Sequence, residues 1–185
     1  MNVVTELNDI VEALQRLDAA LQRYRLAPPR RRVIIFGGAA VLLHAKLQRD
    51  EGPRVTKDID VSLSVTLPSP RELVPFQFYA LHAWQLVPSD YEERLATFPS
   101  LGEFASMDVF VLSAIDLIVL KLCRFRGRDD EDIERLCRIY TLTWVDVRPV
   151  LEATCRDSPA LSANTRNELC QAVLQAFDVH WEPTL

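Results

Sequence analysis

Apolar and polar positions along the chain change their spacing several times, which predicts a mixture of helices and strands. Apolar residues recur at three- and four-residue steps over 4–24, and Pro28-Pro29 ends this amphipathic helix. Apolar or alternating runs predict strands at 33–36, 58–65 and 106–112. Further helices are predicted at 39–48, 71–87, 114–124, 129–140, 144–155 and 162–178, with Ser113 as the cap of the third.

The order of these elements is a helix, an alternating α/β middle and a run of helices, which predicts an α/β (α+β) fold. We expect a small mixed β-sheet flanked by helices, with a C-terminal helical region. A chain of 185 residues buries enough apolar surface to fold without disulfides or a structural metal. We expect one domain over 1–140, which includes the N-terminal helix, and a helical appendage over 141–185.

Charge and cysteine usage narrow the function classes. The chain has 26 acidic and 21 basic residues, and this balance argues against a protein that binds nucleic acid through bulk positive charge. The four cysteines lack the spacing of a metal site, so buried free thiols are favoured over disulfides or zinc. A signal-peptide pattern and an apolar run of membrane-spanning length are both missing, which predicts a cytoplasmic protein with no membrane partner.

The first candidate chemistry is the Asp58-Ile59-Asp60 segment in a predicted strand. Alternate side chains of a strand share a face, so the two carboxylates lie roughly 6–7 Å apart and repel each other. A divalent cation relieves that repulsion, and Mg²⁺ commonly takes one or two carboxylates together with substrate phosphate oxygens. Taken alone, the segment fits a solvated strand face better than a metal site.

Two further features change this balance. Gly37-Gly38 joins a predicted strand to a helix, where backbone N–H groups can face an anion, although a tight turn without a ligand fits equally. Asp108 lies between Met107 and Val109 in another predicted strand, so it is either bound by a partner or placed at a strand end facing water. Three carboxylates beside a phosphate-binding turn form the outline of a two-metal phosphoryl-transfer site.

The segments FGGAAVLLHA, RVTKDIDV and MDVF resemble the nucleotidyltransferase fold of the DNA polymerase β type. More narrowly, SAIDLIVLKLCRFRGRDDEDIERL resembles the later motif of the AbiEii-like group, which includes toxins of bacterial toxin–antitoxin systems. The resemblance spans roughly residues 33–140, and the joint pattern is more specific than any single piece.

The resemblance implies roles for the residues that match. Asp58 and Asp60 would hold the Mg²⁺ ions that bind the triphosphate, and Gly37 and Gly38 would line it. Asp108 would position the attacking hydroxyl or share the second metal ion.

The later motif implies a second set of roles. Lys121 would contact phosphates or counterbalance carboxylates, with a surface lysine as the structural alternative. Asp129 and Asp132 would orient Lys121 or Arg128 within the nucleotide site, or cap their helix. Further candidates for nucleotide contact are Thr56, Lys57 and Arg128, of which the first two also fit a solvated loop.

The expected activity is Mg²⁺-dependent transfer of a nucleoside monophosphate from an NTP to an RNA acceptor, the 3′ end of a tRNA, by a toxin of a toxin–antitoxin system. One alternative is a catalytically silent domain that binds a nucleotide or a partner protein, as an antitoxin or regulator. Another is a protein adenylyltransferase.

Overall fold

The computed structural model describes residue 4 and residues 6–24, 30–50, 56–63, 73, 75–79, 87–158 and 163–183. The chain divides into two compact units. The first, here called the sheet unit, comprises Met1–Ala80 and Leu95–Leu112, and the second, the helical unit, comprises Leu81–Arg94 and Ser113–Leu185. The expected boundary between a domain over 1–140 and a helical appendage over 141–185 stays a prediction.

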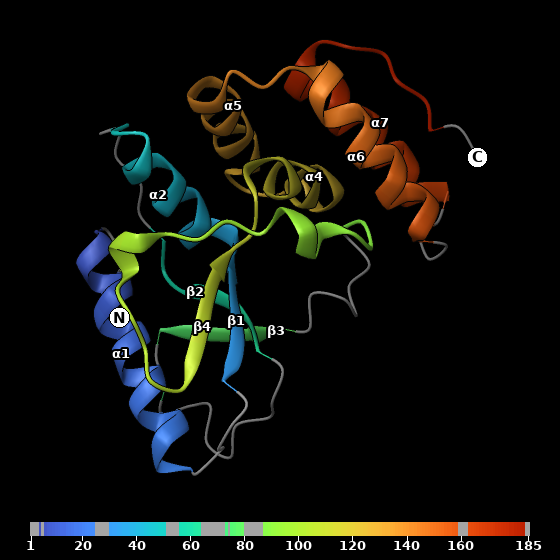
Figure 1. Ribbon diagram of the computed structural model, residues 1–185. Coiled ribbons are helices and arrows are strands. Elements are labelled where there is room, and N and C mark those ends of the chain that lie inside the picture. The colour runs from blue at the N-terminus through green and yellow to red at the C-terminus, as the bar shows by residue number, and fades with distance from the viewer. Residues whose placement is uncertain are drawn as a thin grey trace. The chain divides into compact units, whose positions relative to one another are not determined.

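The sheet unit is a mixed sheet with helices packed on it (Figure 1). The strand order is β3-β2-β1-β4, with β1 antiparallel to β2 and parallel to β4, and β2 parallel to β3. This confirms the predicted fold class. Its elements are α1 (Leu7–Arg23), β1 (Arg31–Phe36), α2 (Gly37–Leu47), β2 (Ile59–Leu63), β3 (Phe76–Tyr79), the 3₁₀ turn η3 (Pro99–Leu101) and β4 (Met107–Val111).

The sheet-unit core is built from the continuous buried run of β1, the buried residues of β2 and the apolar face of α1. Val33 and Ile35 on β1 are fully buried, and the register sets Ile35 opposite Val61 of β2. The residues of α2 are buried from 37 to 45, so this mostly apolar helix is covered on every side, as expected of a helix inside a core. On α1, the carboxylate of Asp18 accepts backbone N–H groups ahead of β4, from Ala105 at 3.1 Å and Ser106 at 2.8 Å.

The helical unit is built around α4, which packs on α5, α6 and α7. The Ser113 hydroxyl accepts the Asp116 N–H at 3.2 Å, which confirms the predicted cap of α4. The four cysteines are free thiols, as predicted, but they are half-buried rather than buried. Among the described helices, none is both long and apolar enough to cross a membrane. The elements are η2 (Tyr91–Arg94), α4 (Ala114–Arg124), α5 (Asp129–Tyr140), α6 (Trp144–Asp157) and α7 (Ala163–Phe177).

The helix predicted at 71–87 is wrong, because β3 occupies its middle. Residues 76–79 read Phe-Gln-Phe-Tyr, and aromatic residues favour a pleated, half-buried surface. Pro75 precedes them, and a proline lacks the N–H that a helix interior needs. Its carbonyl instead accepts the Ile59 N–H at 3.0 Å, where β3 begins beside β2. Much of the remaining predicted helix lies outside the described residues.

Candidate functional site

The paired carboxylates lie at the start of β2. Asp58 immediately precedes the strand and Asp60 is its second residue. Ile59 and Val61 between and beyond them are fully buried, whereas both aspartates are half-buried. The two carboxylates therefore share the face opposite to the buried residues, as the alternation predicts.

Gly37 lies directly against Asp60. The β1–β2 register sets Phe36 opposite Asp60, so the turn from β1 into α2 passes over the carboxylate. A Cβ atom at Gly37 would be 1.9 Å from Asp60 Oδ2, and the residue has a φ of +65°. Only glycine fits this position. The Asp60 carboxylate is consequently next to the N-terminus of α2, where the helix dipole favours negative charge.

Two residues of β3 complete the surroundings of the pair. Gln77 lies opposite Asp60 in the β2–β3 register, and its amide Nε2 donates a hydrogen bond to Asp58 Oδ2. The Tyr79 hydroxyl donates in turn to Gln77 Oε1, while its ring packs against Phe36 with centroids 5.7 Å apart. Sequence reasoning missed both residues because it placed a helix here. The available signal was Pro75 followed by alternating aromatic and polar residues.

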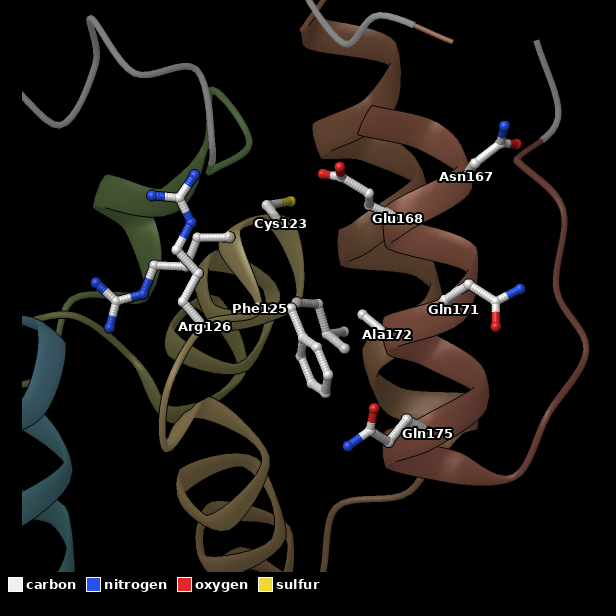
Figure 2. A pocket seen from close by; sticks show the side chains of 10 residues that line it. Cys123, Phe125, Arg126, Asn167, Glu168, Gln171, Ala172 and Gln175 are labelled. Atoms are coloured by element: carbon white, nitrogen blue, oxygen red, sulfur yellow. The ribbon is translucent and has the colours of Figure 1, made fainter. Parts of the chain in front are cut away.

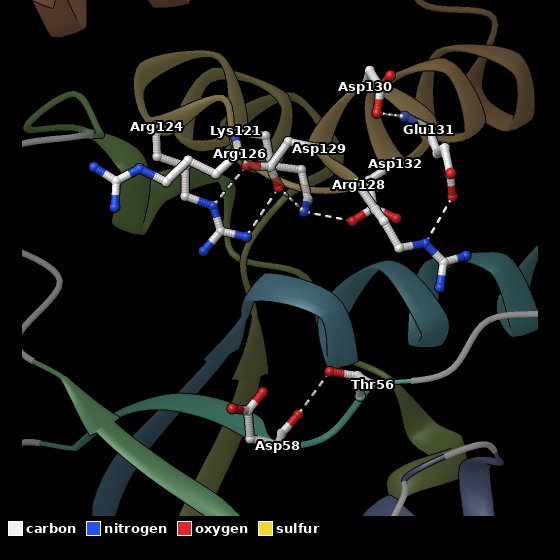
Figure 3. Close-up of polar contacts among 10 residues, drawn as sticks. All are labelled: Thr56, Asp58, Lys121, Arg124, Arg126, Arg128, Asp129, Asp130, Glu131 and Asp132. Carbon is white, nitrogen blue, oxygen red and sulfur yellow. Dashed lines mark hydrogen bonds and ion pairs between the residues drawn. The ribbon is translucent and has the colours of Figure 1, made fainter.

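Thr56 and Lys57 lead into the pair. Thr56 is buried, its hydroxyl donates to the Asp58 backbone carbonyl at 3.1 Å, and its backbone pairs with Val4 at 2.8 and 3.0 Å (Figure 3). These contacts fix the approach of the chain to β2. Lys57 is exposed, one residue before Asp58. Gly38 is buried in the first turn of α2.

The structure does not bring Asp108 to the pair, which corrects the expected three-aspartate arrangement. In the ladders of β1, Asp108 on β4 lies opposite Arg32, whereas Asp60 on β2 lies opposite Phe36. These positions are four residues apart, about 13 Å along the strand, and on different sides of β1. Asp108 is exposed and pairs with Arg30 Nε at 2.9 Å. Within the described residues, no group of three histidines, cysteines or acidic residues is placed to hold a metal ion.

The later motif forms a buried charge cluster in the helical unit, drawn with α4 and α5 in Figure 3. Lys121 of α4 is 1% exposed, and its Nζ donates to Asp129 Oδ1 at 2.9 Å and to Asp132 Oδ2 at 2.6 Å on α5. Arg124 donates from Nε and Nη2 to Asp129, each at 3.0 Å. Of the two roles that the sequence leaves open for Lys121, the structure shows the counterbalancing of carboxylates.

The ionisation of Asp129 follows from this cluster. Burial pushes its pKa upward, but the hydrogen bonds from Arg124 and the charge of Lys121 more than offset burial and hold the pKa below its usual range. The Arg126 backbone N–H adds a further donor at 2.9 Å. Arg128 is instead exposed, and its guanidinium pairs with Glu131 at 2.8 Å rather than with Asp129.

A half-buried carboxylate pair beside a glycine turn, in a small mixed sheet, matches the outline of a nucleotidyltransferase. A family model described as a nucleotidyltransferase of unknown function (DUF6036) matches residues 6–181. The chain therefore belongs to this family, which confirms the resemblance at that level, while the AbiEii-like detail stays a prediction. No curated protein and no solved structure matches the chain.

Proposed function

We propose that the protein transfers a nucleoside monophosphate from an NTP to an acceptor hydroxyl at the Asp58–Asp60 pair. The observation that carries this proposal is the placement of both carboxylates on one face of β2, beside the turn at Gly37. Membership of a nucleotidyltransferase family supports the reaction class.

The donor set of the pair fits Mg²⁺. This ion usually keeps several waters and takes one or two carboxylates plus phosphate oxygens, which is what Asp58, Asp60 and a triphosphate provide together. The two-ion site expected from the sequence needs a third carboxylate, and Asp108 lies apart from the pair. We therefore restrict the proposal to ions held by the pair and the nucleotide. When bound, Mg²⁺ would neutralise phosphate charge that develops during transfer.

The residues of the chain would position the reactants. Gln77 holds the Asp58 carboxylate through its amide, and Lys57 is exposed beside Asp58, where a triphosphate oxygen would meet its charge. The acceptor oxygen would form a bond to the α-phosphorus as the bond to pyrophosphate breaks in line. Catalysis would come chiefly from orientation, since holding two reactants in place removes a large entropic barrier.

The acceptor that we propose is an RNA 3′ end, that of a tRNA, with the protein acting as a toxin that has a cognate antitoxin. The resemblance of residues 113–136 to the AbiEii-like motif supports this choice. The net charge of −5 does not oppose it, because bound divalent ions reverse the local potential that a phosphate meets.

One observation favours a second candidate, a silent domain that binds a nucleotide or a partner protein. Asp58 is already hydrogen-bonded by Gln77, and Asp60 lies against Gly37 at the N-terminus of α2. Both carboxylates therefore have a structural use within the sheet unit. Such a domain would serve as an antitoxin or regulator and would bind NTP without turning it over.

The test is transfer of label from each α-³²P NTP, with Mg²⁺, total tRNA and cell lysate as acceptors. We expect labelled RNA from the wild-type protein, a loss of about 100-fold in Asp58→Asn and Asp60→Asn, and no product with EDTA. Asp130→Asn is the matched control, because Asp130 is exposed at the start of α5.

Other outcomes assign the alternatives. Label on a protein band alone would identify a protein adenylyltransferase. NTP binding without transfer to any acceptor would contradict the enzyme and support the silent domain.

A further inference from the structure

A cavity of about 510 Å³ opens between the C-terminal end of α4 and helix α7 (Figure 2). Both helices belong to the helical unit. Leu122, Phe125 and Ala172 contribute apolar surface, and Glu168 and Gln175 contribute polar groups from α7. This volume lies within the range of small-molecule sites, which combine apolar walls with a few placed polar groups.

Phe125 has an unusual backbone for an aromatic residue. It is the C-cap of α4, with a φ of 27° and a ψ of 73°. A residue with positive φ at this position is usually glycine, because a side chain is strained there. The ring is half-buried, points into the cavity toward α7 and forms no ring pair with any described aromatic residue (Figure 2). Strain kept at a half-buried aromatic residue that lines a cavity is typical of a functional site.

Glu168 supplies the negative charge of the cavity, which Arg124 and Arg126 also line from the side of α4. Its side chain extends from α7 toward α4 (Figure 2), and Asn167 and Gln171 also line the cavity from α7. Within the described part of the chain, the Glu168 carboxylate has no hydrogen bond or ion pair. Glu168 is exposed, and an ionised carboxylate only accepts hydrogen bonds, so a ligand that pairs with it must offer donors. Gln175, two turns further along α7, offers both a donor and an acceptor.

We propose that this cavity binds a guanine base, which stacks on Phe125 and donates its N1–H and N2 amino hydrogens to Glu168. A flat ligand suits an aromatic platform, and stacking accepts any base. The carboxylate selects among the bases. Guanine presents two adjacent donors on one edge, whereas adenine and cytosine present an amino group beside a ring acceptor that a carboxylate repels. Uracil presents one donor between two carbonyl oxygens.

Covalent chemistry does not compete with this role. Cys123 lines the same cavity, but burial raises the pKa of its thiol to about 12, so the thiol stays protonated at neutral pH. The base itself has two sources, a free guanine nucleotide or an unpaired guanine of RNA. The proposal does not rest on the chemistry of the β2 pair.

The test is calorimetric titration of the full-length protein with GMP, AMP, CMP and UMP in EDTA, where Mg²⁺-dependent binding at the β2 pair is absent. We expect GMP to bind about tenfold more tightly than the others. Phe125→Leu should weaken GMP binding about tenfold, Phe125→Trp should retain it, and Glu168→Gln should remove the preference for GMP. Glu12→Gln, at an exposed position of α1, is the matched control for Glu168→Gln, and GMP binding should be unchanged.

Equal binding of all four nucleotides, or GMP binding that survives both Phe125→Leu and Glu168→Gln, would overturn the proposal. If Phe125→Leu does not fold, Phe125→Trp and Glu168→Gln still decide it. A short uridine oligonucleotide with one central guanosine separates the sources. Tighter binding than GMP, lost when uridine replaces the guanosine, identifies an RNA base, and equal binding identifies the free nucleotide.

Discussion

Two pairs of aspartates in this chain look alike in sequence and differ in their surroundings. Asp58 and Asp60 are two residues apart on a strand, and Asp129 and Asp132 are three residues apart on a helix, so each spacing sets both carboxylates on one face. The helical pair is buried and shares the ammonium group of Lys121 at 2.6 and 2.9 Å. The strand pair is half-buried.

The two pairs differ in the kind of group that contacts their carboxylates. Asp58 receives its hydrogen bond from the neutral amide of Gln77, which leaves its negative charge in place. The cluster around Lys121 is instead neutralised inside the helical unit, where an unpaired charge would be costly. A half-exposed carboxylate pair beside a glycine turn suits an external cation, whereas a buried pair that shares one ammonium group holds two helices together. Variants of each pair and of their neighbours test this contrast.

The largest effect is expected on removal of the buried cation. Lys121→Met leaves two buried carboxylates without their shared cation and should lower the free energy of unfolding by about 3–5 kcal/mol. Urea unfolding followed by tryptophan fluorescence measures it, because Trp144 and Trp181 pack together in the helical unit with centroids 5.7 Å apart. Lys46→Met, at an exposed position of α2, is the control. An unchanged midpoint with lost transfer activity would instead mean that Lys121 contacts the substrate.

The next effect concerns the contact between Gly37 and Asp60. Gly37→Ala should cost about 1–2 kcal/mol for the left-handed backbone and about 1–3 kcal/mol more for displacement of the carboxylate. Gly127→Ala is a matched control, since Gly127 has a φ of +60° and no atom within 4 Å of an added Cβ. Asp60→Ala in the Gly37→Ala background should recover part of the loss. An equal loss in the free energy of unfolding for Gly37→Ala and Gly127→Ala would show that the Asp60 side chain moves aside without cost.

A smaller effect is expected from pH. Because the pKa of Asp129 lies below that of the unfolded chain, its contribution to stability is present above about pH 4 and is lost as the pH falls through the folded pKa. The urea midpoint of the helical unit should therefore fall between pH 5 and pH 3. Asp129→Asn should lower the midpoint at pH 5 and flatten this dependence, and Asp130→Asn should do neither.

Most elements of the fold were predictable because their patterns are local. The helices of the C-terminal half show clear periodicity, and Ser113 with Asp116 marks the start of α4. Strand β3 was not, because its apolar residues also fit a helical period and only its pairing with β2 decides between the two. Pro75 is the local signal that favours a strand, because a proline lacks the N–H that a helix interior needs.

Only those features of the candidate site that lie within one strand or one turn were predictable from the sequence. The common face of Asp58 and Asp60 follows from their spacing, and the turn at Gly37 follows from two adjacent glycines between a predicted strand and a predicted helix. The contact from Gln77 depends on which strands become neighbours, and the position of Asp108 depends on strand direction and register. Neither the choice of neighbouring strands nor their register can be predicted from local sequence.

The smallest effect, and the sharpest test of strand register, is expected at Asp108. Its pair with Arg30 is half-exposed, so Asp108→Asn should change the free energy of unfolding by less than about 1 kcal/mol. Arg30 keeps two carbonyl partners, Phe104 and Met107, each at 2.7 Å. Transfer activity should stay within about twofold of wild type, because an exposed change away from the pair removes no contact to the nucleotide. A loss as large as that in Asp60→Asn would mean that Asp108 reaches the pair during catalysis, and β4 would then have to shift along β1 by about 13 Å, four residues of register.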